Sequence, residues 1–200
     1  MIKFYFVCVS PWAYMAMEDL KKISNKYNQE ISFKPIDVLQ TWKVTQAGKS
    51  LADRPRVLQE YRLIELARWS KWRKLEFNFS PKYHPVPYEL SSAVVIASES
   101  LNCDTFIITR ALMQGCWEKE QDISNRESVM SILDSVGVDV ETIMRRAESD
   151  LTRSVISNNT LEALSDGVWS VPSFVINGEL FFGQDRLEMI DWYLSKHNDQ

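Results

Sequence analysis

The sequence predicts an α/β protein in which sheet-forming segments at both ends of the chain enclose a helical middle. An uninterrupted apolar run over residues 2–9 is typical of a strand buried on both faces. A helical pattern follows, and residues 30–38 then alternate like a second strand. Near the other end, Asn177-Gly178 separates two short apolar runs, which is the strongest short-range signal for a β-hairpin. The sheet is therefore expected to combine a parallel strand–helix–strand unit with a hairpin.

The first helix is expected to begin directly after the first strand. Ser10 suits the N-cap position, and Pro11 suits the first position of the helix. Apolar side chains then recur at steps of three and four residues, which gives the helix one apolar face. They are Trp12, Ala16, Leu20, Ile23 and Tyr27.

The chain from about residue 40 to 166 is predicted to be mostly helical. Helices are expected from Asp53-Pro55 toward Leu75, over 88–101, 104–119 and 125–135, from Asp139, and up to about Ser165. Ser124 and Glu127 have the spacing of a capping box for the helix over 125–135. Prolines 81, 85 and 87 indicate an extended loop.

The order of these elements is that of a thioredoxin-like fold (βαβ…ββα) with a large helical insertion. A final helix carrying Leu187 and Ile190 follows the hairpin and completes the order. We therefore expect residues 1–38 and 167–200 to form a thioredoxin-like domain. Residues 39–166 are expected to form an inserted helical domain.

The composition narrows the class of protein. The 200 residues carry a net charge of −4, and no Lys/Arg cluster is longer than a few residues, which argues against a nucleic-acid partner. No apolar stretch is long enough for a membrane span, and the start lacks the plan of a signal peptide. The three cysteines show no paired spacing, which indicates a reducing compartment, and we expect a cytoplasmic protein. Metal-ligand spacing is absent, so no metal is expected.

Ser10-Pro11-Trp12-Ala13 stands at the junction where a thioredoxin-type redox enzyme carries two cysteines. Serine and alanine occupy the two cysteine positions here, so a soluble thiol such as glutathione is expected to supply the sulfur. The Ser10 hydroxyl can donate a hydrogen bond to a thiolate, and the helix dipole favours the same anion. Both effects lower the pKa of a bound thiol. The alternative is that Ser10 only caps the helix.

Several segments together resemble the 2-hydroxychromene-2-carboxylate isomerases, which are relatives of the kappa-class glutathione transferases and of the DsbA-like oxidoreductases. The resemblance extends nearly end to end. It is carried by Phe4-Tyr5-Phe6, Ser10-Pro11-Trp12-Ala13-Tyr14, Arg110-Ala111-Leu112 with Trp117, Gly167–Phe174, and Phe182-Gly183-Gln184-Asp185-Arg186-Leu187. It implies a glutathione-binding thioredoxin fold, with Ser10 as the residue that activates the thiol. Relatives are often dimers, so a homodimer is possible.

The same resemblance implies a set of glutathione-binding residues. Val171-Pro172 resembles the cis-proline element that faces the active-site helix, where the Val171 backbone would pair with the cysteinyl part of glutathione. Gln184 and Asp185 would hold the γ-glutamyl end, or they only cap the last helix.

Other positions depart from the family pattern. A family lysine corresponds to Leu58 here, with Arg56 nearby as a substitute, and a family asparagine corresponds to Lys49. Arg56 and Lys49 are therefore also expected to bind glutathione. A second family asparagine corresponds to Pro87. The residues expected to line an aromatic substrate site between the two domains are Trp12, Tyr83 and Pro85, although most aromatic residues in this region are expected in the core.

The predicted function is a glutathione-dependent isomerase of the 2-hydroxychromene-2-carboxylate type, acting on a conjugated aromatic pyruvate-like substrate in aromatic catabolism. Two alternatives stay open. One is a kappa-like glutathione transferase or peroxidase, which consumes glutathione. The other is a redox-silent binding module with a thioredoxin fold.

Overall fold

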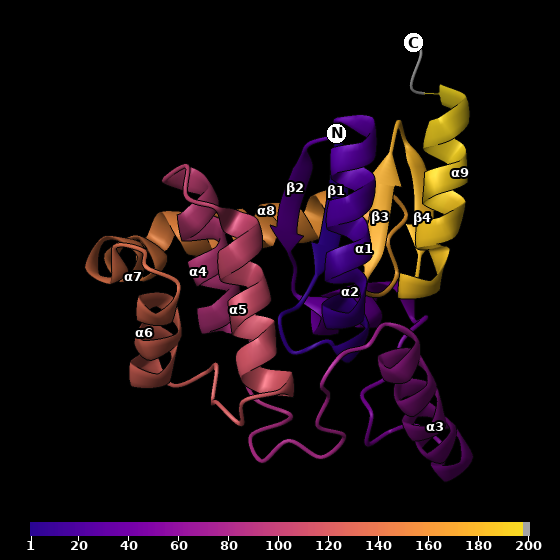
Figure 1. Cartoon of the computed structure of the whole chain (residues 1–200), viewed down its shortest axis with the longest axis horizontal. Helices are drawn as coiled ribbons and strands as arrows, with labels where there is room; N and C mark the ends of the chain where they lie inside the picture. The colour runs from indigo at the N-terminus through magenta and orange to yellow at the C-terminus, as the bar shows by residue number, and fades with distance from the viewer. Residues whose placement is uncertain (198–200) are drawn as a thin grey trace.

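The computed structural model describes residues 1–197, and the strands in that range form one four-stranded sheet of order β2-β1-β3-β4 (Figure 1). The central strand β1 (Ile2–Phe6) runs parallel to β2 (Ile31–Pro35) and antiparallel to β3 (Ser173–Ile176). β3 pairs antiparallel with β4 (Glu179–Phe182). The predicted parallel unit and the predicted hairpin are therefore both confirmed.

The central strand is buried on both faces because its side chains alternate between two layers. Phe4 and Phe6 stack with ring centroids 4.5 Å apart and belong to the main core, together with residues of α1 (Pro11–Tyr27) and α9 (Leu187–His197). Tyr5 points to the opposite face and packs in a second cluster with Ala163 of α8 (Asp150–Ser165). In Figure 1, α1 lies in front of β1, whereas α8 crosses behind the sheet.

The helical middle consists of several helices that share the core of the sheet. They are α2 (Val38–Thr45), α3 (Arg56–Trp72), α4 (Glu89–Ser100), α5 (Thr105–Trp117), α6 (Arg126–Ser135), α7 (Val140–Ala147) and α8. One hydrophobic cluster extends from Phe33 of β2 through Val94 of α4 to Leu112 of α5. The predicted domain boundaries stay a prediction, and residues 198–200 of the second predicted segment lie outside the described residues.

Three details differ from the sequence prediction. The first strand ends at Phe6 and not at Val9, since the chain turns there and the Ser10 N–H donates to the Val7 oxygen at 3.0 Å. The second strand ends at Pro35, because Asp37 caps the N-terminus of α2 by accepting from the Gln40 N–H at 3.0 Å. That helix was not predicted as a separate element.

The third difference is the cap of α6. Ser124 does not cap this helix, because its hydroxyl donates to the Asp122 carboxylate at 2.6 Å. Asn125 is the N-cap and accepts from the Ser128 N–H at 2.9 Å. An asparagine is an equally good cap, so the local sequence did not discriminate between the two positions.

The strand register brings four distant segments to one end of the sheet. Tyr5 pairs with Ser173, Ser173 pairs with Phe182, and Phe6 pairs with Pro35. The residues that follow β1, β2 and β4, and those that precede β3, therefore meet at the same end. Among the described residues, no helix is long and apolar enough to cross a membrane.

Candidate functional site

Ser10 starts α1 at the shared end of the sheet. It is only 7% exposed, has extended backbone angles (φ −82°, ψ 118°), and its Oγ accepts from the Ala13 N–H at 3.2 Å. The predicted N-cap is thus confirmed. No acceptor for the hydroxyl hydrogen of Ser10 is present among residues 1–197. The side chain can therefore cap the helix and still donate one hydrogen bond to a ligand.

The backbone at the start of α1 also carries a partial positive charge. Pro11 has no N–H, and the Trp12 N–H has no acceptor in the described part of the chain. No acidic residue lies in the first turn, so the positive end of the helix dipole is not neutralised. These features suit an anion next to Ser10.

Val171 and Pro172 lie opposite this helix start by the strand register. Their peptide bond is cis. The flanking atoms are fixed: the Pro172 oxygen accepts from the Gly183 N–H at 2.9 Å, and the Ser170 hydroxyl accepts from Trp42 Nε1 at 3.1 Å. Across residues 1–197, neither the N–H nor the carbonyl oxygen of Val171 has a partner. A rigid backbone edge is therefore left open to an extended ligand.

Gln184 and Asp185 follow β4 in a short 3₁₀ helix, η1 (Gln184–Arg186). Gln184 is 4% exposed, and its buried Oε1 has no hydrogen-bond partner in the structure. Asp185 is exposed and forms an ion pair with Arg186 at 2.6 Å. Its carboxylate lies back over Gly183, where an added Cβ would be 2.5 Å from the Asp185 Oδ1. The turn thus presents a carboxylate at the surface and a buried amide oxygen beneath it.

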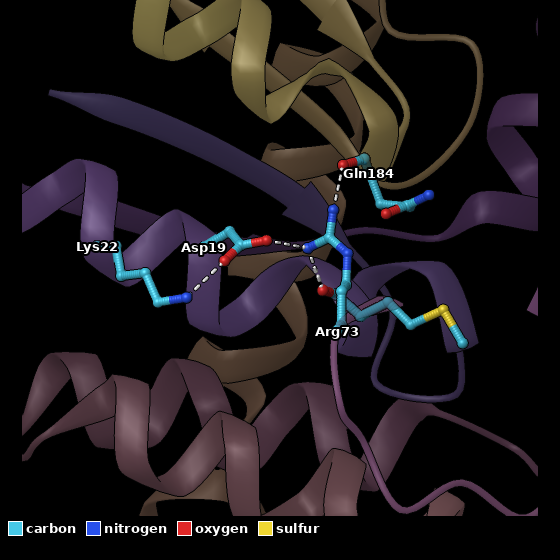
Figure 2. Close-up of polar contacts among 5 residues, drawn as sticks. Asp19, Lys22, Arg73 and Gln184 are labelled. Atoms are coloured by element: carbon cyan, nitrogen blue, oxygen red, sulfur yellow. Dashed lines mark hydrogen bonds and ion pairs between the residues drawn. The ribbon is translucent and has the colours of Figure 1, made fainter. Parts of the chain in front are cut away.

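Arg73, a residue that the sequence prediction missed, holds this turn in place (Figure 2). One of its terminal nitrogens donates to the Met15 oxygen at 2.6 Å and to Asp19 Oδ2 at 2.7 Å. The other donates to the backbone oxygen of Gln184 at 3.0 Å. Burial lowers the pKa of the Arg73 guanidinium, and Asp19 opposes that change. Arg73 therefore joins the end of α3 to α1 and to η1.

His84 forms another side of the site. Its ring is half-buried, with the centroid 4.6 Å from that of Trp117, and it also interacts with the backbone of Val9. Burial, together with the nearby positive charge of Arg62, lowers the pKa of His84 to about 4. The imidazole is therefore neutral at pH 7. It lies near Ser10, because it interacts with the backbone of Val9, the residue before Ser10. The fully buried Trp117 beside it has an Nε1 without a partner in the described structure.

The other two predicted glutathione-binding residues, Lys49 and Arg56, both lie at the surface. Lys49 is exposed and lines a shallow groove of about 410 Å³ with Trp42. Arg56 lies in solvent, with 91% of its side chain exposed, and pairs with Glu60 at 2.7 Å. The structure shows no contact of Arg56 with Ser10, Val171 or Gln184 among the described residues.

The predicted substrate-lining residues lie on two segments. Trp12 is half-buried in the first turn of α1. Tyr83 is half-buried with the Lys82 Nζ 4.7 Å from its ring, and Pro85 is exposed after a cis peptide bond with His84. The interaction of His84 with Val9 places the second segment next to the start of α1.

The two buried cysteines are unsuited to redox chemistry at this site. Cys8 and Cys116 are buried, and burial raises the pKa of each thiol to about 12. Both stay protonated at neutral pH and are poor nucleophiles. Cys8 is fully buried although it lies beyond the end of β1, which stops at Phe6.

The fold and this site are those of a thioredoxin-type protein whose redox cysteines are replaced. The family of DSBA-like thioredoxin domains matches residues 1–195, so the chain belongs to this family. The predicted thioredoxin-like fold is thereby confirmed.

Two curated proteins and one solved structure are similar over nearly the whole chain. A 2-hydroxychromene-2-carboxylate isomerase of Sphingobium xenophagum is 21% identical over 194 residues, which cover 96% of this chain and 97% of that protein. Glutathione S-transferase kappa 2 of Caenorhabditis elegans is 21% identical over 207 residues, with coverages of 98% and 92%. The solved structure of a 2-hydroxychromene-2-carboxylate isomerase has a TM-score of 0.80 at 21% identity, with coverages of 98% and 94%. The resemblance seen in the sequence motifs is confirmed by these matches.

Proposed function

We propose that this protein is a glutathione-dependent isomerase of the 2-hydroxychromene-2-carboxylate type. Its substrate would be a conjugated aromatic pyruvate-like compound, interconverted between 2-hydroxychromene-2-carboxylate and trans-o-hydroxybenzylidenepyruvate. The observation that carries the proposal is the start of α1. A free hydroxyl hydrogen on Ser10 and an unpaired Trp12 N–H meet there, and the nearby Cys8 thiol is buried and protonated. The isomerase and kappa transferase relatives support the same assignment.

The residues at the sheet end fit glutathione. The unpaired N–H and carbonyl oxygen of Val171 match the backbone of a cysteinyl residue, which has one donor and one acceptor. The Asp185 carboxylate suits the ammonium of a γ-glutamyl group, and the buried Gln184 amide lies beside it. Lys49 shares a groove with Trp42, whose Nε1 donates to the Ser170 hydroxyl, so Lys49 would add a positive charge near Val171.

When bound, glutathione supplies a thiol that can add reversibly to a conjugated enone, after which the former double bond can rotate as a single bond. The role of Ser10 is to donate its hydroxyl hydrogen to the thiolate form, while its lone pair stays engaged with the Ala13 N–H. The Trp12 N–H and the helix dipole stabilise the same negative charge. Because His84 is neutral at pH 7, it adds no positive charge, and the stabilisation of the thiolate is left to Ser10, the Trp12 N–H and the helix dipole.

The aromatic part of the substrate would lie against Trp12, Tyr83 and Pro85. These side chains are half-buried or exposed, so part of their apolar surface is accessible to a ligand. The neutral imidazole of His84 interacts with the backbone of Val9, next to Ser10, and could accept a hydrogen bond from a hydroxyl of the substrate.

The test is to incubate the purified protein with trans-o-hydroxybenzylidenepyruvate and to vary glutathione. We expect the absorbance change of isomerisation to require glutathione, while the amount of free glutathione before and after complete conversion stays equal. No isomerisation at saturating glutathione would refute the proposal.

A kappa-like transferase or peroxidase is the second candidate, and it is favoured by the similarity to the kappa 2 protein of Caenorhabditis elegans. Such an enzyme consumes glutathione, so stoichiometric loss with a generic electrophile would identify it. A redox-silent binding module would show neither reaction nor heat of binding with glutathione. A cytoplasmic location, where glutathione is abundant, and a homodimer stay predictions.

A further inference from the structure

Trp42 on α2 joins two segments of the proposed glutathione site that are far apart in the sequence. Its indole Nε1 donates to the Ser170 hydroxyl at 3.1 Å, across a separation of 128 residues. In Figure 1, α2 lies at the end of the sheet where β3 begins, next to the residues that precede this strand. Ser170 directly precedes Val171, whose backbone N–H and carbonyl oxygen have no partner within residues 1–197.

Ser170 is held through both of its oxygen atoms. It is 7% exposed, its hydroxyl oxygen accepts the indole N–H, and its carbonyl oxygen accepts from the Ser173 hydroxyl at 2.7 Å. Residues 170–172 form a bend that precedes β3 and lies outside the strand ladder. Because such a bend is ordered by its individual contacts, the indole bond helps to fix the peptide that links Ser170 to Val171.

The same indole supports the loop that carries Lys49. Gly48 packs directly on the five-membered ring of Trp42, where an added Cβ would overlap Cδ1 and Nε1. Glycine permits this close approach because it has no side chain. Lys49 follows in the sequence and lines the groove with Trp42, and its carbonyl oxygen accepts from Arg54 Nε at 3.1 Å. One side chain therefore contacts both the bend before β3 and the loop at Lys49.

We propose that Trp42 is a positioning residue for glutathione. Its N–H holds the Ser170–Val171 peptide in the orientation that pairs with the cysteinyl backbone, and its ring holds Gly48, so that Lys49 faces the same ligand. The inference rests on the proposed function, because it concerns the same glutathione site. Trp42 acts through these neighbours, and its effect is on affinity, since an edge that is already ordered loses less entropy when the ligand binds.

The experiment measures the affinity for two ligands by calorimetry. They are glutathione and its analogue with 2-aminobutyrate in place of cysteine, which keeps the peptide backbone and lacks the thiol. Trp42→Phe keeps an aromatic ring next to Gly48 and removes the indole N–H. We expect both ligands to bind this variant about 3- to 10-fold more weakly, as for the loss of one neutral hydrogen bond. The kcat at saturating glutathione should stay unchanged, because the thiol is not affected.

Two further variants and a control test the same bond. Ser170→Ala removes the acceptor, so it should cause the same loss as Trp42→Phe. The double variant should lose no more than either single variant, because both substitutions break one interaction. Gly48→Ala displaces the ring and should weaken both ligands at least as much. The control is Trp192→Phe, which should change nothing, since Trp192 is 60% exposed on α9 and lies outside the site.

The indole N–H resonance of Trp42 is a second readout, which a purely structural role would not move. NMR assigns it by its disappearance in Trp42→Phe, and it should shift in a folded Ser170→Ala protein because its acceptor is lost. In the wild type, both ligands should shift this resonance, whereas that of Trp192 should stay in place. A wild type that binds glutathione without any shift of the Trp42 resonance would overturn the inference.

The remaining outcomes separate this inference from the proposed function. Unchanged affinity in a folded Trp42→Phe protein overturns the positioning role, and so do losses that add in the double variant. If the wild type isomerises its substrate with glutathione while Trp42→Phe binds glutathione normally, the positioning role fails and the proposed function stands. If glutathione binds through Trp42 but no isomerisation occurs, the proposed function fails and the positioning role stands. If the wild type binds neither ligand, both fail.

Discussion

The guanidinium of Arg73 and the backbone oxygen of Gln184 lie 3.0 Å apart, across a sequence separation of 111 residues. This bond connects the end of α3 with η1, and the same guanidinium also holds the Met15 oxygen and the Asp19 carboxylate (Figure 2). One buried side chain thereby fixes the turn that carries Asp185 relative to the helix that begins at Ser10. The position of the proposed γ-glutamyl contact therefore depends on Arg73.

Replacing Arg73 with Met should therefore affect both stability and binding. We expect a loss of about 2–3 kcal/mol in the free energy of unfolding, because three hydrogen bonds vanish and the Gln184 oxygen loses its donor. Glutathione should also bind more weakly. The control is Arg153→Met, which breaks an exposed pair with Asp150 and should cost under about 0.5 kcal/mol. Equal losses for the two variants in urea denaturation would contradict the role assigned to Arg73.

The hydroxyl of Ser10 should shift the titration of bound glutathione. One charge-assisted hydrogen bond of about 1.5–3 kcal/mol corresponds to roughly 1–2 pKa units, so a thiol that titrates near ~8.5 should titrate near ~7 when bound. In Ser10→Ala we expect most of this shift to be lost, with a cost of ~1 kcal/mol in stability for the missing cap. The measurement is thiolate absorbance against pH.

A matched control for Ser10→Ala is Asp139→Ala, which removes the cap of α7 and the bond from the Thr142 N–H at 3.0 Å. It should cost similar stability but leave the thiolate titration unchanged. Identical titration curves for wild type and Ser10→Ala would show that Ser10 only caps its helix.

Substitutions in the ion pair of Asp185 with Arg186 test whether Asp185 binds the γ-glutamyl ammonium or has only a structural role. Asp185→Asn should weaken glutathione about 10-fold if the carboxylate holds the γ-glutamyl ammonium. Arg186→Gln releases that carboxylate from its 2.6 Å ion pair and should leave affinity unchanged or increase it. Calorimetry on the two variants decides the matter. A weaker complex with Arg186→Gln than with Asp185→Asn would remove Asp185 from the site.

Gly183 is required by its backbone and by its neighbour. Its φ is +106°, which non-glycine residues rarely adopt, and an added Cβ would displace the Asp185 carboxylate. We expect Gly183→Ala to cost about 1–3 kcal/mol and to weaken glutathione. Gly137→Ala is the control, because Gly137 also has a positive φ of +74° but nothing within 4 Å of the added Cβ. Thermal unfolding should show the larger loss of stability for Gly183→Ala. A larger loss for Gly137→Ala would show that the contact of the added Cβ with Asp185 does not destabilise the protein.

Acid should destabilise the protein through His84. Its folded-state pKa is lowered from 6.5 to about 4, so the unfolded chain binds the proton more readily between these values. The contribution of neutral His84 is present above about pH 6.5 and is lost as the pH falls toward 4. Allowing for partial exposure, we expect a loss of about 2 kcal/mol. His84→Gln should flatten this part of the pH dependence. A variant with the same pH profile as the wild type would refute this prediction.

Local chemistry made part of the fold predictable. Ser10 and Pro11 mark a helix start by their own hydrogen-bonding capacity, and Asn177-Gly178 marks a hairpin because both residues accept a positive φ, as the structure shows at 51° and 81°. Such signals need no knowledge of distant residues.

Other features depend on tertiary contacts, so local sequence signals could not predict them. Arg73 and Gln184 are far apart in the sequence, so no spacing rule connects them. Arg56 was favoured for its nearness to a motif position, whereas the structure turns it into solvent, where it pairs with Glu60.

The serine at the start of α1 also changes how such an enzyme responds to oxidants. A cysteine there could store a glutathionyl group as a mixed disulfide and would follow the redox poise of the thiol pool. A hydroxyl cannot, and the two buried cysteines stay protonated behind it. Turnover would then depend on the concentration of reduced glutathione and not on its ratio to the oxidised form. The residue at the start of α1 could not itself be oxidised to a disulfide, as the cysteines of a dithiol enzyme can.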